Sequence, residues 1–139
     1  MTDNCKLCVL HQEEAGRVVY KSENVYSIVP YAPMALGHVM ILPYRHTRFE
    51  ELNIEELLQL RDMSSRLKDK LVELYPTAPP LFVSVMDTSH ASIPDHFHYH
   101  LIPSAVKLSE LLAAYHHTDA KRVILPASEL ELMAQRLRE

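Results

Sequence analysis

Short apolar runs separated by polar turns fill the first third of the chain. The β-branched and aromatic runs at 17–21 and 25–30 have the spacing of a β-hairpin. A loop rich in Pro and Ala over 30–36 follows, and the apolar run 38–43 predicts a third strand. Because side chains alternate between the two faces of a strand, His38 is expected to share a face with every second residue after it.

The middle of the chain has the period of an amphipathic helix. Asn53, with Glu56 three residues later, resembles a capping box, and leucine and methionine then recur every three or four residues as far as Leu74. This is the longest predicted helix. After a turn with two prolines, residues 81–86 predict a buried strand and 87–95 a polar loop.

The last third of the chain begins with an alternating run at 96–102, which predicts a strand. A short helix over 108–115 and a further short strand over 122–125 are expected to follow. A final helix is expected to be capped by Ser128, with Glu131 in the capping-box position.

Composition limits the number of domains and the class of partner. At 139 residues, 47% of them hydrophobic, the chain is long enough for one core and too short for two ordinary domains. The net charge is −4 and the basic residues are scattered, so we do not expect nucleic acid as a partner. No apolar run approaches the roughly 20 residues that cross a bilayer, and no signal-like segment opens the chain. We therefore predict a cytoplasmic single-domain protein with no membrane partner.

Three histidines alternate with hydrophobic residues between positions 96 and 102. On a strand, the imidazoles of His96, His98 and His100 would line one face, and the hydrophobic residues would pack on the other. A single histidine is more often a solvated or core residue, but three at a period of two favour a reactive face. Because a neutral imidazole can attack phosphorus and pass on a proton near pH 7, this face suits phosphate chemistry.

Both cysteines of the chain lie in one Cys-x-x-Cys, at Cys5 and Cys8. In a reducing compartment this spacing indicates a metal site or a redox pair rather than a structural disulfide. No thioredoxin-like βαβ pattern surrounds the two cysteines, which weakens the redox interpretation.

The run 96–102 resembles the signature of the histidine triad family, His-φ-His-φ-His-φ-φ with φ apolar. Residues 37–46 resemble the Gly-His-(apolar)-Pro-x-x-His strand of the same family, and the resemblance covers roughly residues 5–104. It implies an α+β, HIT-like fold: an antiparallel sheet of about five strands with one long helix. Residues 1–139 would then form one domain in which 105–139 are an α-rich C-terminal extension.

The resemblance also implies roles for the histidines and cysteines. His98, the middle histidine, would be the nucleophile, and His38 and His100 would flank it near the transferred phosphate. Family members with Cys-x-x-Cys, and the related galactose-1-phosphate uridylyltransferases, imply a structural zinc site completed by two histidines. Carried onto this sequence, the zinc ligands are Cys5, Cys8, His46 and His96. Such a closed tetrahedral site would pin the N-terminal segment to the sheet and would not activate water.

The phosphate loop departs from the family pattern. Members usually carry a hydroxyl or amide three residues before the first histidine of the triad, and Asn or Gln further back, where this chain has Ile93 and Val85. A one-residue insertion shortly before the triad would place Ser92 and Ser84 in these roles, and Ser92 could then donate a hydrogen bond to the phosphate. An ordinary loop serine is the alternative.

The residues expected to bind the nucleoside also depart from the family pattern. Pro30 stands where many members place an Asp on the ribose hydroxyls. Tyr26 and Ile28 of the first hairpin could sandwich a base, although such residues on a short strand are more often core.

These observations predict a nucleotide phosphate hydrolase or nucleotidyltransferase that forms a covalent nucleotidyl-histidine. Dinucleoside polyphosphates, nucleoside phosphoramidates and nucleotide sugars fit as substrates. The alternative is a zinc-stabilised nucleotide-binding or regulatory protein with little or no turnover. A homodimer is expected, since the helix after Asn53 carries a long apolar stripe and related proteins pair through this helix and the neighbouring strand. The same stripe could instead cover the protein's own sheet.

Overall fold

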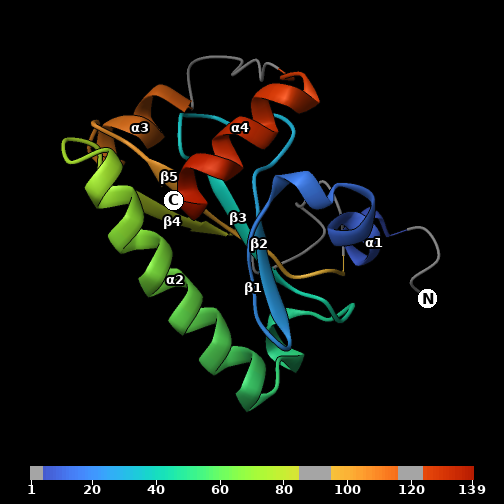
Figure 1. Ribbon diagram of the computed structural model, residues 1–139. Coiled ribbons are helices and arrows are strands. Elements are labelled where there is room, and N and C mark those ends of the chain that lie inside the picture. The colour runs from blue at the N-terminus through green and yellow to red at the C-terminus, as the bar shows by residue number, and fades with distance from the viewer. Residues whose placement is uncertain (1–4, 85–94, 116–123) are drawn as a thin grey trace.

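A five-stranded antiparallel sheet forms the centre of the protein in the computed structural model, which describes residues 5–84, 95–115 and 124–139 (Figure 1). The strand order is β1-β2-β3-β5-β4, so β1 and β4 are the edges. The strands are β1 (Val18–Lys21), β2 (Val25–Ile28), β3 (Val39–Pro43), β4 (Pro80–Ser84) and β5 (Tyr99–Pro103). The predicted α+β class and the predicted first hairpin are confirmed.

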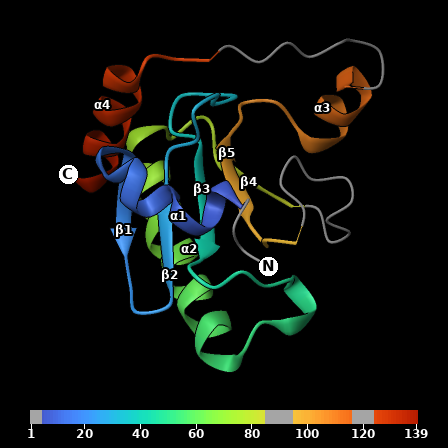
Figure 2. The ribbon, with the colours of Figure 1, turned by 90° about the vertical axis from the view of Figure 1, so that its right-hand side faces the viewer.

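Helices cover both faces of the sheet (Figures 1 and 2). The long helix α2 (Ile54–Leu74) packs on one face, and α4 (Ala127–Arg138) lies on the same face over β1. The N-terminal helix α1 (Lys6–Glu13) covers the opposite face, where Leu7 packs against residues of β1, β2 and β3. The short helix α3 (Leu108–Tyr115) follows β5. None of the helices within the described ranges is long and apolar enough to span a membrane.

Helix α2 begins at the predicted capping box. The Asn53 side-chain oxygen accepts a hydrogen bond from the Glu56 backbone N–H at 2.8 Å, and the Glu56 carboxylate accepts one from the Asn53 N–H at 3.0 Å. This exchange satisfies donors that the first turn of a helix cannot pair internally. The inward stripe then packs on the sheet through four fully or almost fully buried residues: Leu60, Met63, Leu67 and Leu71.

Two strands differ from their predictions. Strand β5 begins at Tyr99 rather than at residue 96, because the backbone groups before it bond outside the ladder: the Phe97 N–H donates to the Thr47 carbonyl, and the His98 carbonyl accepts from the Ser84 hydroxyl. The predicted buried strand over 81–86 corresponds over 81–84 to the edge strand β4, whose Phe82 side chain is 63% exposed, and residues 85 and 86 lie outside the described ranges. A run of apolar residues alone does not distinguish a central strand from an edge strand that another surface could cover.

The C-terminal helix starts two residues earlier than expected, at Ala127. Pro126 occupies the N-cap position without a side-chain hydrogen bond, so the predicted cap at Ser128 is wrong. Proline holds its φ at a helical value and lets the helix start directly after it, which places Ser128 inside the first turn. The predicted strand over 122–125 is not formed at 124 and 125, and its first two residues lie outside the described ranges.

Helix α4 completes the core on the α2 face of the sheet. Leu130, Ala134 and Leu137 are buried against residues of β1 and β2, and the Tyr20 hydroxyl donates to the Leu137 carbonyl at 3.1 Å. Helix α4 is therefore part of the core on this face.

Replacing Leu130 with alanine is expected to lower the free energy of unfolding by about 2–5 kcal/mol, because the side chain is 2% exposed and truncation leaves a cavity. Leu132→Ala on the same helix is the matched control: its side chain is 57% exposed, so its effect should stay within about 0.5 kcal/mol. Urea unfolding followed by circular dichroism measures both. Equal effects from the two variants would contradict this role of α4.

Candidate functional site

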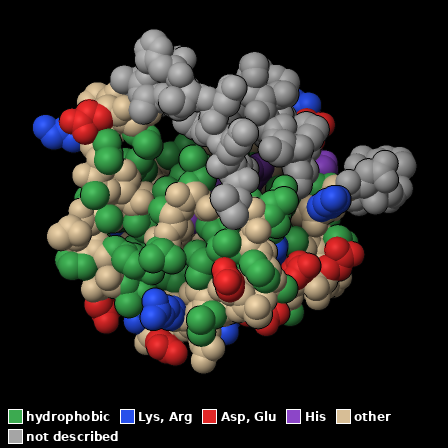
Figure 3. All heavy atoms as spheres, turned by 90° about the horizontal axis from the view of Figure 1, so that it is seen from above, with side chains coloured by type: hydrophobic (Ala, Val, Ile, Leu, Met, Phe, Trp, Pro, Cys, Tyr) green, Lys and Arg blue, Asp and Glu red, His purple; other side chains and the backbone are tan. Residues whose placement is uncertain are grey.

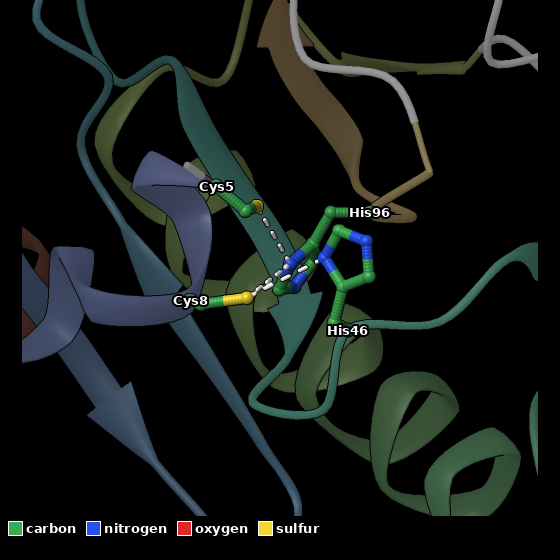
Figure 4. A group of neighbouring side chains, drawn as sticks. All are labelled: Cys5, Cys8, His46 and His96. Carbon is green, nitrogen blue, oxygen red and sulfur yellow. Dashed lines mark hydrogen bonds between the residues drawn. The ribbon is translucent and has the colours of Figure 1, made fainter. Parts of the chain in front are cut away.

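Four side chains from three separate segments meet beside α1 (Figure 4). Cys5 and Cys8 come from the start of α1, His46 from the turn after β3, and His96 from the segment before β5. One ligand atom from each lies within 4.8 Å of the others. The Cys8 sulfur lies 3.4 Å from Nδ1 of both imidazoles, and the Cys5 sulfur lies 3.3 Å from Nδ1 of His96. This is the predicted metal-ligand set.

The protonation state of His96 suits metal binding. Its ring is completely buried, and its Nε2 lies 2.9 Å from the Pro43 carbonyl, which can only accept a hydrogen bond. The ring proton is therefore on Nε2, and the lone pair of Nδ1 points at the thiols. Burial lowers the pKa of His96 to about 4, so the ring is neutral at physiological pH, as a ligand must be.

The two thiols lie close enough to influence each other. Burial, together with the hydrogen bond between Cys8 and Cys5 and the charge of the Cys5 sulfur, raises the pKa of Cys8 to about 11. A bound cation acts in the opposite direction, since it deprotonates a coordinating thiol. Two thiolates and two imidazole nitrogens form the closed donor set of structural metal sites, so these residues fit a metal ion and could bind one.

A second group of histidines lies on the same face of the sheet. His98 Nδ1 is 2.9 Å from the His96 backbone carbonyl, so Nδ1 carries the proton and Nε2 keeps its lone pair. Burial lowers the pKa of His98, which keeps the ring neutral and nucleophilic near pH 7. The His98 and His100 ring centroids are 5.4 Å apart, and those of His38 and His100 are 5.0 Å apart.

Hydrogen bonds order the protons through this group. The Met34 backbone N–H donates to His38 Nδ1 at 3.0 Å, so His38 must carry its proton on Nε2. That Nε2 lies 2.9 Å from His100 Nδ1 and donates to it. A neutral His100 therefore holds its proton on Nε2. One backbone amide thus assigns the tautomers of two imidazoles.

The turn before β3 brings His38 to this position. Gly37 has a φ of +85°, and a Cβ atom there would lie 2.6 Å from the Tyr75 ring, so both the backbone angle and the space require glycine. Hydrophobic side chains gather on the surface at this end of the molecule (Figure 3). Of the loop residues, Tyr31 is 56% and Leu36 64% exposed. The loop that orients His38 therefore presents apolar side chains to solvent.

The three histidines of the predicted triad divide between the two groups. His96 joins the cysteines and His46, whereas His98 and His100 join His38. The side chains of this run still alternate between the two faces of the sheet, since Phe97, Tyr99 and Leu101 pack in the core on the α2 face. The row of imidazoles is thus one structural element that serves two sites.

The predicted substrate residues are in different environments. The Ser84 hydroxyl donates to the His98 carbonyl at 2.9 Å, and Ser92 lies outside the described residues. Tyr26 and Ile28 are completely buried beneath α1, where the Tyr26 hydroxyl donates to the Leu7 carbonyl at 3.0 Å. Neither side chain presents surface to a base in this structure.

Residues 11–106 match the model of the HIT domain, a stretch that contains His46 and all three residues of the second histidine group. The chain belongs to the HIT family. The matched stretch begins after Cys8 and ends before α4, so the two thiols and the C-terminal helix lie outside it.

Solved structures of HIT proteins share the fold at low sequence identity. A hypothetical histidine triad nucleotide-binding protein from Sulfolobus tokodaii is 20% identical, with a TM-score of 0.73 over 96% of this chain and 89% of its own. A zinc-bound histidine triad family protein from Mycobacterium smegmatis is 18% identical, with a TM-score of 0.68 over 99% and 95%. The diadenosine triphosphate hydrolase of Plasmodium falciparum is 18% identical, with a TM-score of 0.69 over 88% and 74%. No curated protein matches the sequence of this chain.

Proposed function

We propose that this HIT protein is a nucleotide phosphate hydrolase or nucleotidyltransferase whose nucleophile is Nε2 of His98. The observation that carries the proposal is the hydrogen bond from His98 Nδ1 to the His96 carbonyl, which leaves a neutral ring with its lone pair on Nε2. Covalent catalysis at phosphorus needs such a nitrogen, and a neighbouring donor to stabilise the charge that develops. His100 is that neighbour.

In the first step, His98 Nε2 attacks the α-phosphorus and the bond from phosphorus to the leaving group breaks. The leaving group departs with the bonding electron pair and takes up a proton from solvent, while His100 Nε2–H donates a hydrogen bond to the phosphate oxygens. The hydrogen bond from His38 Nε2 to His100 Nδ1 holds His100 in the tautomer that makes this donation. In the second step, water or another acceptor attacks the nucleotidyl-histidine, loses a proton and releases His98. Hydrolase and transferase differ only in this acceptor.

Three substrate classes fit this chemistry: dinucleoside polyphosphates, nucleoside phosphoramidates and nucleotide sugars. The diadenosine triphosphate hydrolase among the structural neighbours supports the first. Incubating the protein with one member of each class and following products by chromatography tests the proposal. Release of a nucleoside monophosphate from at least one is expected from the wild type and not from His98→Ala.

A nucleotide-binding or regulatory protein with little turnover is the second candidate. The departures from the family pattern at Pro30 and Ile93 favour it. Saturable nucleotide binding without product in the same incubations would select this candidate.

We propose that Ser92 and Ser84 contact the phosphate of the substrate. The bond from Ser84 to the His98 carbonyl places its hydroxyl beside the nucleophile's backbone.

We propose that the metal bound by Cys5, Cys8, His46 and His96 is zinc. Its four protein ligands would leave no open position, so the ion would hold α1 against the turn after β3 and take no part in the chemistry. Elemental analysis of untagged protein should find one zinc per chain, and a Cys5→Ser, Cys8→Ser double variant should contain none. Wild-type protein without metal, or thiols that titrate equally with and without chelator, would contradict this and favour the redox alternative.

We also propose that the protein is a homodimer. The core uses one stripe of α2, yet Ile54, Leu57 and Leu58 on the same helix remain 44–74% exposed. On the edge strand β4, Phe82 stacks on Tyr99 at 4.5 Å between ring centroids and still exposes 63% of its surface. A partner that covers this edge and this helix would bury both apolar sets.

Sedimentation at micromolar concentration should therefore give a dimer. Phe82→Glu should shift it to a monomer, because a carboxylate would have to be buried in the interface. Leu132→Glu, at an exposed position of α4, is the matched control and should stay dimeric. A monomeric wild type would refute the proposal.

A further inference from the structure

Glu56 is a charged residue in a buried position. Its side chain is only 2% exposed, yet the predicted capping box needs just one of its oxygens. Both oxygens also accept hydrogen bonds from Arg45: Oε1 from Nη2 at 2.7 Å and Oε2 from Nε at 3.2 Å. A bidentate pair of this kind is strong and directional, and a buried carboxylate that lost it would be costly.

Arg45 connects this carboxylate to the turn that follows β3. Its Nη2 also donates to the Glu51 backbone carbonyl at 2.9 Å, so one guanidinium links the turn to the segment before α2 as well as to Glu56. Arg45 directly precedes His46, which extends from this turn toward the cysteines (Figure 4).

The same turn also holds the second imidazole of the metal centre. The Pro43 carbonyl accepts from His96 Nε2 at 2.9 Å, and the Thr47 carbonyl accepts from the Phe97 backbone N–H at 2.7 Å. Residues 43–47 thus supply one imidazole ligand and orient the other. Any shift of this turn would move both imidazoles relative to the thiols.

We infer that Glu56 is a positioning residue for the metal centre: through Arg45 it anchors the 43–47 turn, and with it both imidazole ligands, to the start of α2. This inference rests on the metal site proposed above. Partners outside the ligand sphere that orient ligands typically contribute 10–100-fold to metal affinity. Because Glu56 acts through a turn, we expect the lower end, about tenfold.

Cobalt(II) is the probe, since its visible spectrum reports a tetrahedral site of two sulfurs and two nitrogens. Its affinity is measured by chelator competition on the full chain. Glu56→Gln and Arg45→Met should each bind Co²⁺ about tenfold more weakly than the wild type, with an altered visible spectrum. Arg45→Lys keeps the positive charge but not the bidentate geometry. Its affinity for Co²⁺ should therefore lie between that of these two variants and that of the wild type.

Two controls separate positioning from general stability. Asn53→Ala removes the side-chain cap of α2 but leaves Arg45 and Glu56 paired, so it should lower the apo-protein Tm and bind Co²⁺ like the wild type. Arg61→Met breaks the exposed pair of Arg61 with Asp62 on the same helix and should change neither quantity.

Three results would overturn the inference. If the wild type binds no Co²⁺ and no zinc, the metal site itself is wrong. If the wild type binds and all variants bind equally well, the metal site stands and the role of Glu56 is refuted. If Asn53→Ala weakens Co²⁺ binding as much as Glu56→Gln at an equal loss of apo-protein Tm, then helix stability and not positioning accounts for the effect. A double variant, Arg45→Met with Glu56→Met, keeps the test available if the single variants do not fold.

Discussion

Replacing His98 with alanine is expected to reduce turnover by about 10³-fold or more while the melting temperature changes little. In the proposed mechanism this side chain supplies the nitrogen that attacks phosphorus, since among His38, His98 and His100 only His98 combines a backbone-bound Nδ1–H with a lone pair on Nε2. Its side chain is half-buried and bonds to the His96 carbonyl only two residues away. Steady-state kinetics and a thermal melt on the same preparation measure the two effects.

His98→Asn is the matched variant for this test. The asparagine amide can still donate to the His96 carbonyl, so the local backbone keeps its hydrogen bond, but the side chain has no nucleophilic nitrogen. It should be as inactive as His98→Ala and at least as stable. Wild-type turnover in either variant would mean that a different group attacks the phosphate.

Replacing His96 with alanine is expected to lower stability and activity together. A metal present at about 1,000 times its Kd stabilises the folded chain by about 4 kcal/mol, and for a chain of this size that corresponds to a Tm lower by roughly 10 °C. Loss of the ring also leaves the Pro43 carbonyl without its buried partner. Activity should fall because the carbonyl that orients His98 belongs to the same residue.

Chelation separates these two causes. Treating the wild type with a chelator should lower its Tm by nearly as much as the substitution does, whereas the same treatment of His96→Ala should have almost no further effect. A His96→Ala variant that still contains one zinc per chain and melts like the wild type would show that His96 is not a ligand. Differential scanning fluorimetry of both proteins, with and without chelator, measures these Tm values.

Local signals in the sequence predicted the parts of the fold that local interactions determine. The capping box at Asn53 and Glu56 marked the start of α2 because both of its hydrogen bonds lie within three residues. Gly37 sits in the turn before β3, where it has a positive φ. By contrast, the start of β5 was placed three residues too early, because the contacts that turn His96 away from the sheet come from α1 and from the end of β3.

The candidate site was accessible from the sequence only in part. The resemblance to the histidine triad family indicated the four side chains of the candidate metal site and the three other histidines by residue type. The groups that set their protonation are the Met34 amide and the carbonyls of Pro43 and His96, which are backbone atoms without any sequence signal. The burial of Tyr26 under α1 likewise depends on tertiary packing that no periodicity near residue 26 encodes.

Acid-quenched mass spectrometry can detect the proposed covalent bond between His98 and phosphorus. The wild type is mixed with a substrate that it hydrolyses and quenched within one turnover. The protein is then digested under conditions that preserve phosphoramidates, and its peptides are mapped. A nucleotidyl mass increase is expected on the peptide that contains His98, and none on the same peptide of His98→Asn. An adduct on another residue, or full single-turnover product formation without any adduct, would contradict it.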